Sequence, residues 1–245
     1  MHRTADMRRG AGGDTGPSQP YIKIKVGEGR AGSNRWTALP ATAISCSGIQ
    51  AMATSTTFAP FRLTICGIPE LDKHCAAGVT HILSIHDPDL ADPPEFAGYP
   101  PHNRLALRFH DIIEPQPNRI APSQGDVERL LEFGRELGTA PDAHLLVHCH
   151  AGVSRSTAAA ALILAQAAPE RPAGAVFEAI IRMRPRAWPN LRILEFGDRL
   201  LGRNGEILAA VPAVYRGVLD RQPEMEEAMI EGGRLREVLA ALSGP

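Results

Sequence analysis

The segment 144-HLLVHCHAGVSRSTAAAALIL-164 constrains the possible folds of this chain more than any other part of it. Residues 143-AHLLVHC-149 form an apolar run of strand length, and the alanine-rich run that begins at Ser156 is typical of a buried helix. Between them lies a loop of mostly small residues, 150-HAGVS-154. A helix N-terminus has unpaired amide donors and partial positive charge, so this strand–loop–helix unit predicts a site for an anion.

Cys149 stands at the floor of this predicted anion site, and its neighbours favour covalent chemistry. A thiol that faces a helix N-terminus and an arginine ionises readily, and the thiolate is the nucleophilic form. The Arg155 guanidinium matches two phosphate oxygens, and the Ser156 hydroxyl could donate to the sulfur as a covalent intermediate breaks down. The residues expected to bind the phosphate are His150, Ala151, Gly152, Val153, Ser154 and Arg155. The alternative interpretation is a core cysteine followed by an arginine that caps a helix.

Strand-like and helical patterns alternate along most of the chain, which favours a single α/β domain with a central, largely parallel β-sheet flanked by helices. Strands are expected at 61–67, 79–85, 104–110 and 143–149. Helices are expected at 70–78, after a capping box of Ser123 and Asp126, from Ser156, and near 173–183, 190–203 and 223–242.

Residues 1–57 differ from the rest in composition, since they are rich in Gly, Ala, Ser, Thr and Pro. Only 21-YIKIKV-26 alternates like a strand there, so we expect a largely disordered N-terminal extension, with a short accessory hairpin as the alternative interpretation. Met52 is an alternative start of translation. The catalytic domain is expected at 58–210, and residues 211–245 are expected to form a C-terminal helical extension.

Composition excludes several classes of partner. The net charge of −1 gives no bulk attraction to nucleic acid or to an anionic membrane, so neither is expected. No apolar run reaches the roughly 18 residues of a membrane span, and the N-terminus lacks the apolar segment of a secretory signal. The four cysteines form no CxxC pair, which favours a reduced, cytoplasmic compartment. The nine histidines show no metal-binding spacing, so no metal is expected.

The residues 148-HCHAGVSRS-156 resemble the HCxxGxxR(S/T) motif of the protein tyrosine phosphatase superfamily. The wider layout, from Phe61 to Gly205, is similar to the compact dual-specificity-like branch, in particular to the tyrosine phosphatases predicted in bacteria. The resemblance implies that Cys149 forms a phosphocysteine intermediate while Arg155 and the loop hold the phosphate. It implies no metal and no organic cofactor.

The same resemblance implies a general acid on a loop upstream of the cysteine, because the departing oxygen needs a proton. Asp111 is the candidate, since it follows the strand expected at 104–110 and parallel strands end at one edge of a sheet. Glu114 is the second candidate. Asp126 is interpreted as a capping residue, and Asp87 and Asp89 are less favoured because they lie in a variable loop.

Three other features have a structural and a functional interpretation. Cys66 ends the first expected strand and is interpreted as a core thiol, with reversible oxidation against Cys149 as the alternative. Asn190 is interpreted as a helix N-cap. A cluster of arginines is interpreted as a solvated helix face, with reception of an acidic substrate as the alternative; its members are Arg182, Arg184 and Arg186.

These expectations lead to one function and two alternatives. The chain is expected to hydrolyse phosphomonoesters, in the first place phosphotyrosine on proteins and also phosphoserine or phosphothreonine. The first alternative is a phosphatase of a non-protein substrate, an RNA 5′-phosphate or a small molecule. The second is a phosphate-binding protein without catalysis, although such a protein would usually lack the cysteine, the arginine or the acid. The oligomeric state is left open.

Overall fold

The computed structural model of this protein describes residues 58–140 and 142–243. The expected N-terminal extension over 1–57, the strand-like run at 21–26 and the alternative start at Met52 lie outside these residues. The α/β class expected from the sequence is confirmed by the arrangement of the strands and helices described below.

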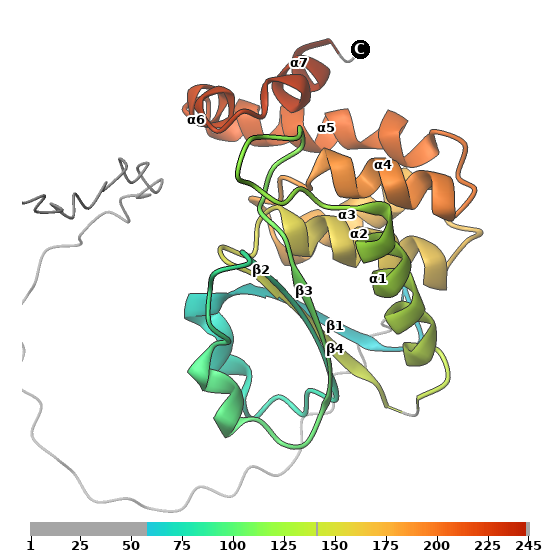
Figure 1. Ribbon diagram of the computed structural model, residues 1–245. Coiled ribbons are helices and arrows are strands. Elements are labelled where there is room, and N and C mark those ends of the chain that lie inside the picture. Colours follow the sequence, from blue (N-terminus) through green and yellow to red (C-terminus); the bar gives the residue numbers. More distant parts are fainter. Residues whose placement is uncertain (1–57, 141, 244–245) are drawn as a thin grey trace, which may run out of the picture. The chain divides into compact units, whose positions relative to one another are not determined.

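Four parallel strands form the sheet, in the order β1-β4-β2-β3 (Figure 1). The strands are β1 (Arg62–Gly67), β2 (His81–His86), β3 (Asn103–Arg108) and β4 (His144–Cys149). The central strands β2 and β4 are buried along their whole length, as expected for continuous apolar runs in a parallel sheet. Because all four strands run the same way, the chain segments that follow them meet at one edge, where Cys149 lies.

The sheet separates two apolar layers. On one face, Leu83, Leu145 and Val147 join the large core made with the α-helices. On the other face, Ile82 and Leu146 pack in a smaller cluster with Leu71. Two short 3₁₀ helices cover that smaller cluster, η1 (Ile68–His74) and η2 (Pro94–Gly98). Alternate residues of β4 therefore point to opposite layers, and the Cys149 side chain belongs to the layer of the α-helices.

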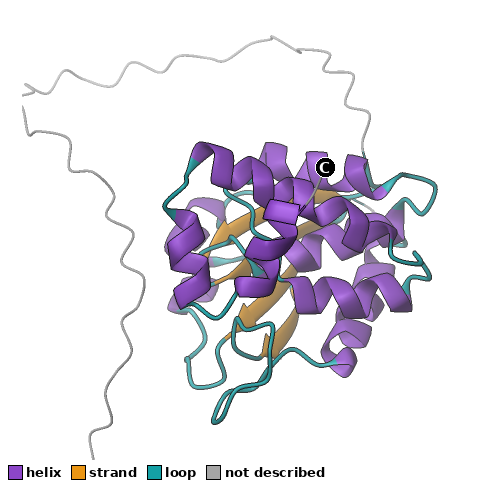
Figure 2. Cartoon of the chain, turned by 90° about the horizontal axis from the view of Figure 1, so that it is seen from above, coloured by secondary structure: helices purple, strands orange, loops and turns teal. Residues whose placement is uncertain are grey.

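The first four α-helices form the larger layer with α5 and α7 (Figures 1 and 2). Their bounds are α1 (Gln124–Leu137), α2 (Arg155–Ala167), α3 (Ala173–Met183) and α4 (Leu191–Leu200). The predicted caps are confirmed: Ser123 and Asp126 form a capping box, and the Asn190 side chain accepts from the Ile193 amide at 3.1 Å. No helix in the described ranges is long and apolar enough to cross a membrane.

The C-terminal part differs from the sequence prediction. The helix expected near 223–242 is two helices, α6 (Met225–Glu231) and α7 (Leu235–Ser243). Gly233 has a φ of 74° at their junction, a left-handed conformation that ends one helix and redirects the chain. A further helix, α5 (Glu206–Arg221), was not predicted, and the boundary expected between 210 and 211 falls inside it.

The N-terminal part differs less. The helix expected at 70–78 is the 3₁₀ helix η1, which begins earlier because Pro69 occupies its first turn. The strand expected at 79–85 begins at His81, and the strand expected at 104–110 ends at Arg108. These shifts of about two residues are the usual uncertainty of element ends. They leave Asp111 three residues beyond β3, at the same edge of the sheet as Cys149.

Candidate active site

The cysteine loop, residues 150–154, has all of its carbonyl groups occupied. Each one accepts a hydrogen bond from a donor outside the loop. The donors, in loop order, are the amide of Ile68, the guanidinium of Arg184 for two carbonyls, the amide of Trp188, and the amides of Ala158 and Asn190. Within the described residues, no amide of the loop donates to a protein acceptor. These amides are therefore available to an anion with several oxygens.

Arg184 corrects the prediction that this arginine cluster is a solvated helix face. Its Nε donates to Gly152 O at 3.1 Å and its Nη2 donates to Ala151 O at 3.2 Å. Glu70 holds the guanidinium from the other side at 3.1 Å and accepts from the Gly67 amide at 2.7 Å. Burial opposes the effect, but these hydrogen bonds lower the pKa of Glu70. Arg184 and Glu70 thus fix the loop, while Arg182 and Arg186 are exposed.

Cys149 lies below the loop with its side chain almost inaccessible, at 3% exposure. Its Sγ is 3.2 Å from Ser156 Oγ, in the first turn of α2, so the two predicted residues are in contact. Ser154 is also buried and precedes α2 as its N-cap residue. His150 and Ala151 are exposed and Val153 is half-buried, so these three line the entrance to the loop.

Arg155 is buried beside the loop, also at 3% exposure. Only one side of its guanidinium is held by the protein: Nη1 donates to Asp87 Oδ1 at 2.6 Å and to Phe109 O at 2.7 Å. Its Nε is buried without a described partner. A buried donor without an acceptor is costly, and a phosphate oxygen would satisfy it. Asp87, which the sequence offered only as an unfavoured acid, therefore orients Arg155.

Asp111 lies in the same cluster as the cysteine loop. Its Oδ1 accepts from Ser154 Oγ at 2.8 Å, from Asn190 Nδ2 at 2.9 Å and from Arg234 Nη1 at 3.1 Å. Burial favours the neutral acid, but the charges of Arg234 and then Arg155 outweigh it and lower the pKa of Asp111. The side chain keeps 31% exposure, so one carboxylate oxygen remains open to a ligand.

The other candidate acids are used elsewhere. Glu114 accepts from Arg236 Nε at 2.8 Å and is 53% exposed. Asp126 accepts from the amide and hydroxyl of Ser123 in the capping box of α1. Asp89 lies in the loop after β2. Among the candidates, Asp111 is the one hydrogen-bonded to the cysteine loop, through Ser154.

Cys66 is fully buried, and its side chain belongs to the layer opposite that of Cys149. In the sheet it pairs with His148, while Cys149 pairs with Gly67. Burial raises the pKa of the Cys66 thiol to about 12. All three observations favour the interpretation of Cys66 as a core thiol.

His148 and His86 form a buried pair behind the loop, which the sequence did not indicate. His148 Nε2 is 2.8 Å from Ser84 Oγ and 3.4 Å from His86 Nε2. Burial lowers the pKa of His148 to about 3 and that of His86 to about 4. Both rings are therefore neutral at pH 7, and they support the end of β4 without adding charge.

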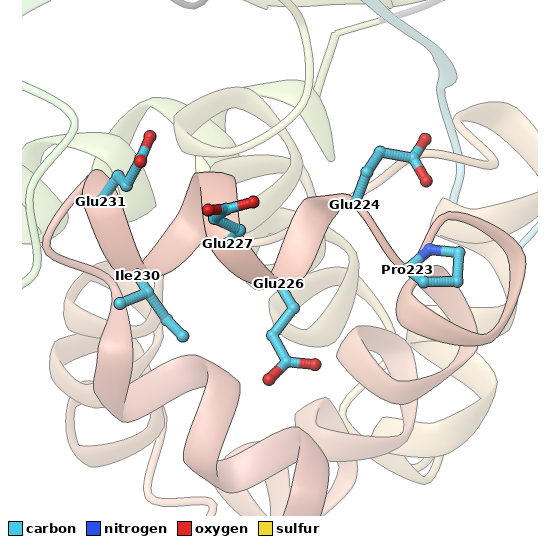
Figure 3. Close-up of a pocket in the computed structure, with 6 residues that line it drawn as sticks. All are labelled: Pro223, Glu224, Glu226, Glu227, Ile230 and Glu231. Atoms are coloured by element: carbon cyan, nitrogen blue, oxygen red, sulfur yellow. The ribbon is translucent and has the colours of Figure 1, made fainter.

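Elsewhere on the surface an open hollow of about 470 Å³ lies over α6 (Figure 3). It is lined by Pro223, Glu224, Glu226, Glu227, Ile230 and Glu231, and it shares no residue with the cluster around Cys149. The residues that the structure describes contain no group of three or more His, Cys, Asp and Glu that could hold a metal ion.

Comparison with solved structures finds proteins of similar fold. This chain is similar to human DUSP28, with a TM-score of 0.45 and 18% identity over 60% of this chain and 97% of that one. It is also similar to the Yvh1 phosphatase domain from Chaetomium thermophilum, with a TM-score of 0.42 and 19% identity over 61% and 94% of the two chains. For DUSP15 the TM-score is 0.42 and the identity 24%, over 61% and 92%.

These proteins are dual-specificity and related phosphatases, of the superfamily that the sequence motif resembles. No protein-family model matches the chain, and no curated protein sequence matches it.

Proposed function

We propose that this protein is a cysteine-dependent phosphatase that hydrolyses phosphomonoesters through a phosphocysteine intermediate. The cysteine loop is the observation that supports this most directly. Among the residues that the structure describes, its carbonyls all accept hydrogen bonds and its amides donate to no protein acceptor, around a buried thiol. The unpartnered Nε of Arg155 adds a further donor. Together, the loop amides and the Arg155 guanidinium suit the three equatorial oxygens of a phosphoryl group in the transition state of its transfer better than they suit a neutral ligand.

In the first step, the Cys149 thiolate attacks phosphorus in line with the departing oxygen. A sulfur–phosphorus bond forms as the phosphorus–oxygen bond breaks, and Asp111 in its protonated form gives its proton to the leaving alkoxide or phenoxide. Because the pKa of Asp111 is lowered, this step is expected to slow as the pH rises. Arg155 and the loop amides hold the equatorial oxygens throughout. Asp87 keeps the Arg155 fork in place through its bond to Nη1.

In the second step, water attacks the phosphocysteine and Asp111 takes its proton. The sulfur leaves as a thiolate, and Ser156 Oγ, at 3.2 Å, donates to it as the negative charge develops. The products are inorganic phosphate and the alcohol, and the enzyme returns to its starting state. No metal or organic cofactor takes part in this proposal.

We propose phosphotyrosine on proteins as the principal substrate, with phosphoserine and phosphothreonine as further substrates. The nearly inaccessible Cys149 lies below an entrance formed by exposed His150 and Ala151. Such a position favours a phosphate carried by a long side chain, as in phosphotyrosine. Because Cys66, Cys75 and Cys149 are all free thiols and the mechanism needs a reduced sulfur, we also propose a reducing, cytoplasmic location.

The test of the proposed function is hydrolysis of para-nitrophenyl phosphate in the presence of a chelator. Cys149→Ser should lose at least roughly a thousandfold in kcat, because the two-step route then has no nucleophile. Acid-quenched wild-type enzyme should carry one covalent phosphate on Cys149 by mass spectrometry. Cys75→Ser, at a half-buried thiol in the other layer, is the matched control and should keep full activity. Turnover that survives in Cys149→Ser would overturn the proposal.

A panel of phosphopeptides then separates the substrate classes. The proposal expects the highest kcat/KM for phosphotyrosine peptides, and lower values for the same peptides with phosphoserine or phosphothreonine. A preference for an RNA 5′-phosphate or for small phosphomonoesters over every peptide would contradict the proposed substrate. It would not contradict the proposed cysteine-dependent mechanism.

A further inference from the structure

The junction between α6 and α7 brings an arginine from the C-terminal part of the chain into the candidate active site. Arg234 follows Gly233, whose φ of 74° turns the chain inward, and its side chain is 6% exposed. Its Nη1 donates to Asp111 Oδ1 at 3.1 Å and its Nη2 donates to Ser154 Oγ at 3.1 Å. One guanidinium therefore contacts both the proposed acid and the cysteine loop.

The donors around Asp111 are arranged unevenly between its two oxygens. Arg234, Asn190 and Ser154 all donate to Oδ1. Within the described residues, Oδ2 accepts no hydrogen bond, and the side chain is 31% exposed. A carboxyl group fixed through one oxygen presents the other in a defined direction. Oδ2 is thus the oxygen that can carry the proton to and from a substrate.

The same C-terminal segment also holds the rest of the acid loop, residues 111–118. Arg236 bridges Glu114, at 2.8 Å, and Glu195 of α4. Gly233 lies so close to this loop that a side chain there would meet Gln116 at 3.1 Å. Three residues of the C-terminal segment therefore lie against the acid loop and limit its movement: Gly233 and Arg234 at the α6–α7 junction and Arg236 in α7.

Arg234 is held in turn by a buried carboxylate. Glu237, with no exposed surface, accepts from Arg234 Nη2 at 2.8 Å, from the Leu191 amide at 2.8 Å and from Trp188 Nε1 at 2.6 Å. The Trp188 amide is also a donor to the cysteine loop. Glu237 of α7 is thus linked through Arg234 to Asp111 and through Trp188 to the cysteine loop. A positioning residue requires such fixed support.

We propose that Arg234 is a positioning residue for the general acid, and that the C-terminal segment is an integral part of the active site. The proposal rests on the proposed function, in which Asp111 protonates the leaving oxygen. Arg234 fixes Oδ1 so that Oδ2 faces the substrate, and Arg236 keeps the acid loop from swinging away. Neither arginine contacts the phosphate.

The charges around Asp111 set the expected pH dependence. Arg155 faces it from α2 and Arg234 faces it from the α6–α7 junction, while Ser154 and Asn190 are neutral. Asp87 and Glu237 lie one step further away, each paired with one of the arginines. Removal of the Arg234 charge raises the pKa of Asp111, so the acid stays protonated to higher pH. The descending limb of the activity profile, where Asp111 loses its proton, then moves to higher pH.

The experiment compares wild type with Arg234→Gln and Arg234→Lys on a series of aryl phosphates of increasing leaving-group pKa. At the pH optimum of each enzyme, Arg234→Gln should lose roughly tenfold to a hundredfold in kcat on phenyl phosphate. Its loss on 2,4-dinitrophenyl phosphate, which leaves without a proton, should be less than about threefold. The descending limb should shift to higher pH. Arg234→Lys should keep the position of that limb.

Two further variants are needed, one in case Arg234→Gln does not fold and one as a control. Removal of one partner of a buried ion pair can unfold a protein, so Arg234→Gln with Glu237→Gln, which removes both charges, replaces the single variant if that one does not fold. Arg216→Gln is the matched control, because Arg216 also holds α7, through Ala241 O at 2.6 Å, and within the described ranges it makes no hydrogen bond to the acid loop.

The possible outcomes separate the two proposals. Equal losses on good and poor leaving groups, with an unmoved pH limb, would show a merely structural arginine and overturn this inference alone. The same leaving-group dependence in Arg216→Gln as in Arg234→Gln would overturn it as well. A wild-type enzyme without turnover on any aryl phosphate would overturn the proposed function and this inference with it.

Discussion

At Gly152 the cysteine loop packs so closely against β1 that there is no room for a Cβ atom. The φ of Gly152 is 69°, in the left-handed region, and a Cβ there would lie 2.5 Å from the backbone carbon of Cys66. Both the conformation and the space therefore require glycine. The loop amides can converge on one point only because this residue allows the chain to turn and to approach β1 so closely.

Gly152→Ala is expected to lower kcat/KM by at least about a hundredfold, the loss that follows when one donor of an anion-binding loop is displaced. The measurement is hydrolysis of para-nitrophenyl phosphate together with inhibition by vanadate. Gly174→Ala is the control, because Gly174 in α3 has no atom within 4 Å of an added Cβ. That variant should keep its activity. Undiminished vanadate inhibition in Gly152→Ala would contradict the account of the loop.

Arg184 lies outside the cysteine loop and donates hydrogen bonds to two of its carbonyls. Arg184→Met leaves the carbonyls of Ala151 and Gly152 without their donors, so the loop loses its fixed shape. We expect kcat/KM to fall roughly tenfold to a hundredfold, because small displacements of reacting groups are costly. Arg182→Met, at an exposed arginine in the last turn of α3, should change little. Equal effects in the two variants would show that only the net charge of this surface matters.

At the scale of elements, the end of β4 depends on a buried pair of neutral histidines. Unfolded histidine binds a proton below a pKa of about 6.5, whereas His86 does so only near 4 and His148 only near 3 in the folded chain. Between these values the unfolded state binds more protons, so the free energy of unfolding falls as the pH falls. This contribution to stability is complete above pH 6.5 and is lost progressively towards pH 4.

Urea unfolding at several pH values tests the histidine pair. Wild type should lose roughly 1.4 kcal/mol per pH unit for each of the two histidines between pH 6 and pH 4. In His86→Phe one of these contributions should disappear, so the slope against pH becomes shallower. His102→Gln, at a histidine that bonds the exposed Pro100 carbonyl, is the control and should keep the wild-type slope. An unchanged slope in His86→Phe would contradict the pH account.

At the scale of the whole molecule, the described C-terminal helices and the loops of the candidate active site share one hydrogen-bonded core. Trp188 donates to Glu237 of α7, stacks on Tyr215 of α5 at 4.6 Å between ring centres, and its amide binds the cysteine loop. The Tyr215 hydroxyl donates to Pro189 O at 2.5 Å, just before Asn190. The docking of α7 and the shape of the site should therefore be lost together.

A denaturant titration tests this coupling in a Trp36→Phe background, where Trp188 is the remaining tryptophan. Trp188 fluorescence and phosphatase activity should disappear in one transition with the same midpoint, as for a two-state unit. A fluorescence change that is complete at denaturant concentrations where activity is still full would contradict it. It would mean that α7 leaves the core without disturbing the cysteine loop.

The sequence predicted local features of this molecule well and distant contacts poorly. The unit around Cys149 could be recognised because strand, loop and helix follow one another directly, and the cap at Asn190 is equally local. Arg184 was misread because its partners lie more than thirty positions away, and exposed arginines are common in this chain. Arg234 could not be assigned because its contact with Asp111 spans 123 positions. The helix α5 was missed because Pro212 and Gly217 interrupt its pattern.

The order of residues along the chain has a consequence for synthesis. The proposed nucleophile, the cysteine loop and the proposed acid are all translated before Arg234, which comes 123 positions after Asp111. Until that arginine has been synthesised, the acid loop lacks its contact at Asp111. On the proposed function, full turnover is therefore expected only once α6 and α7 have been synthesised and have docked.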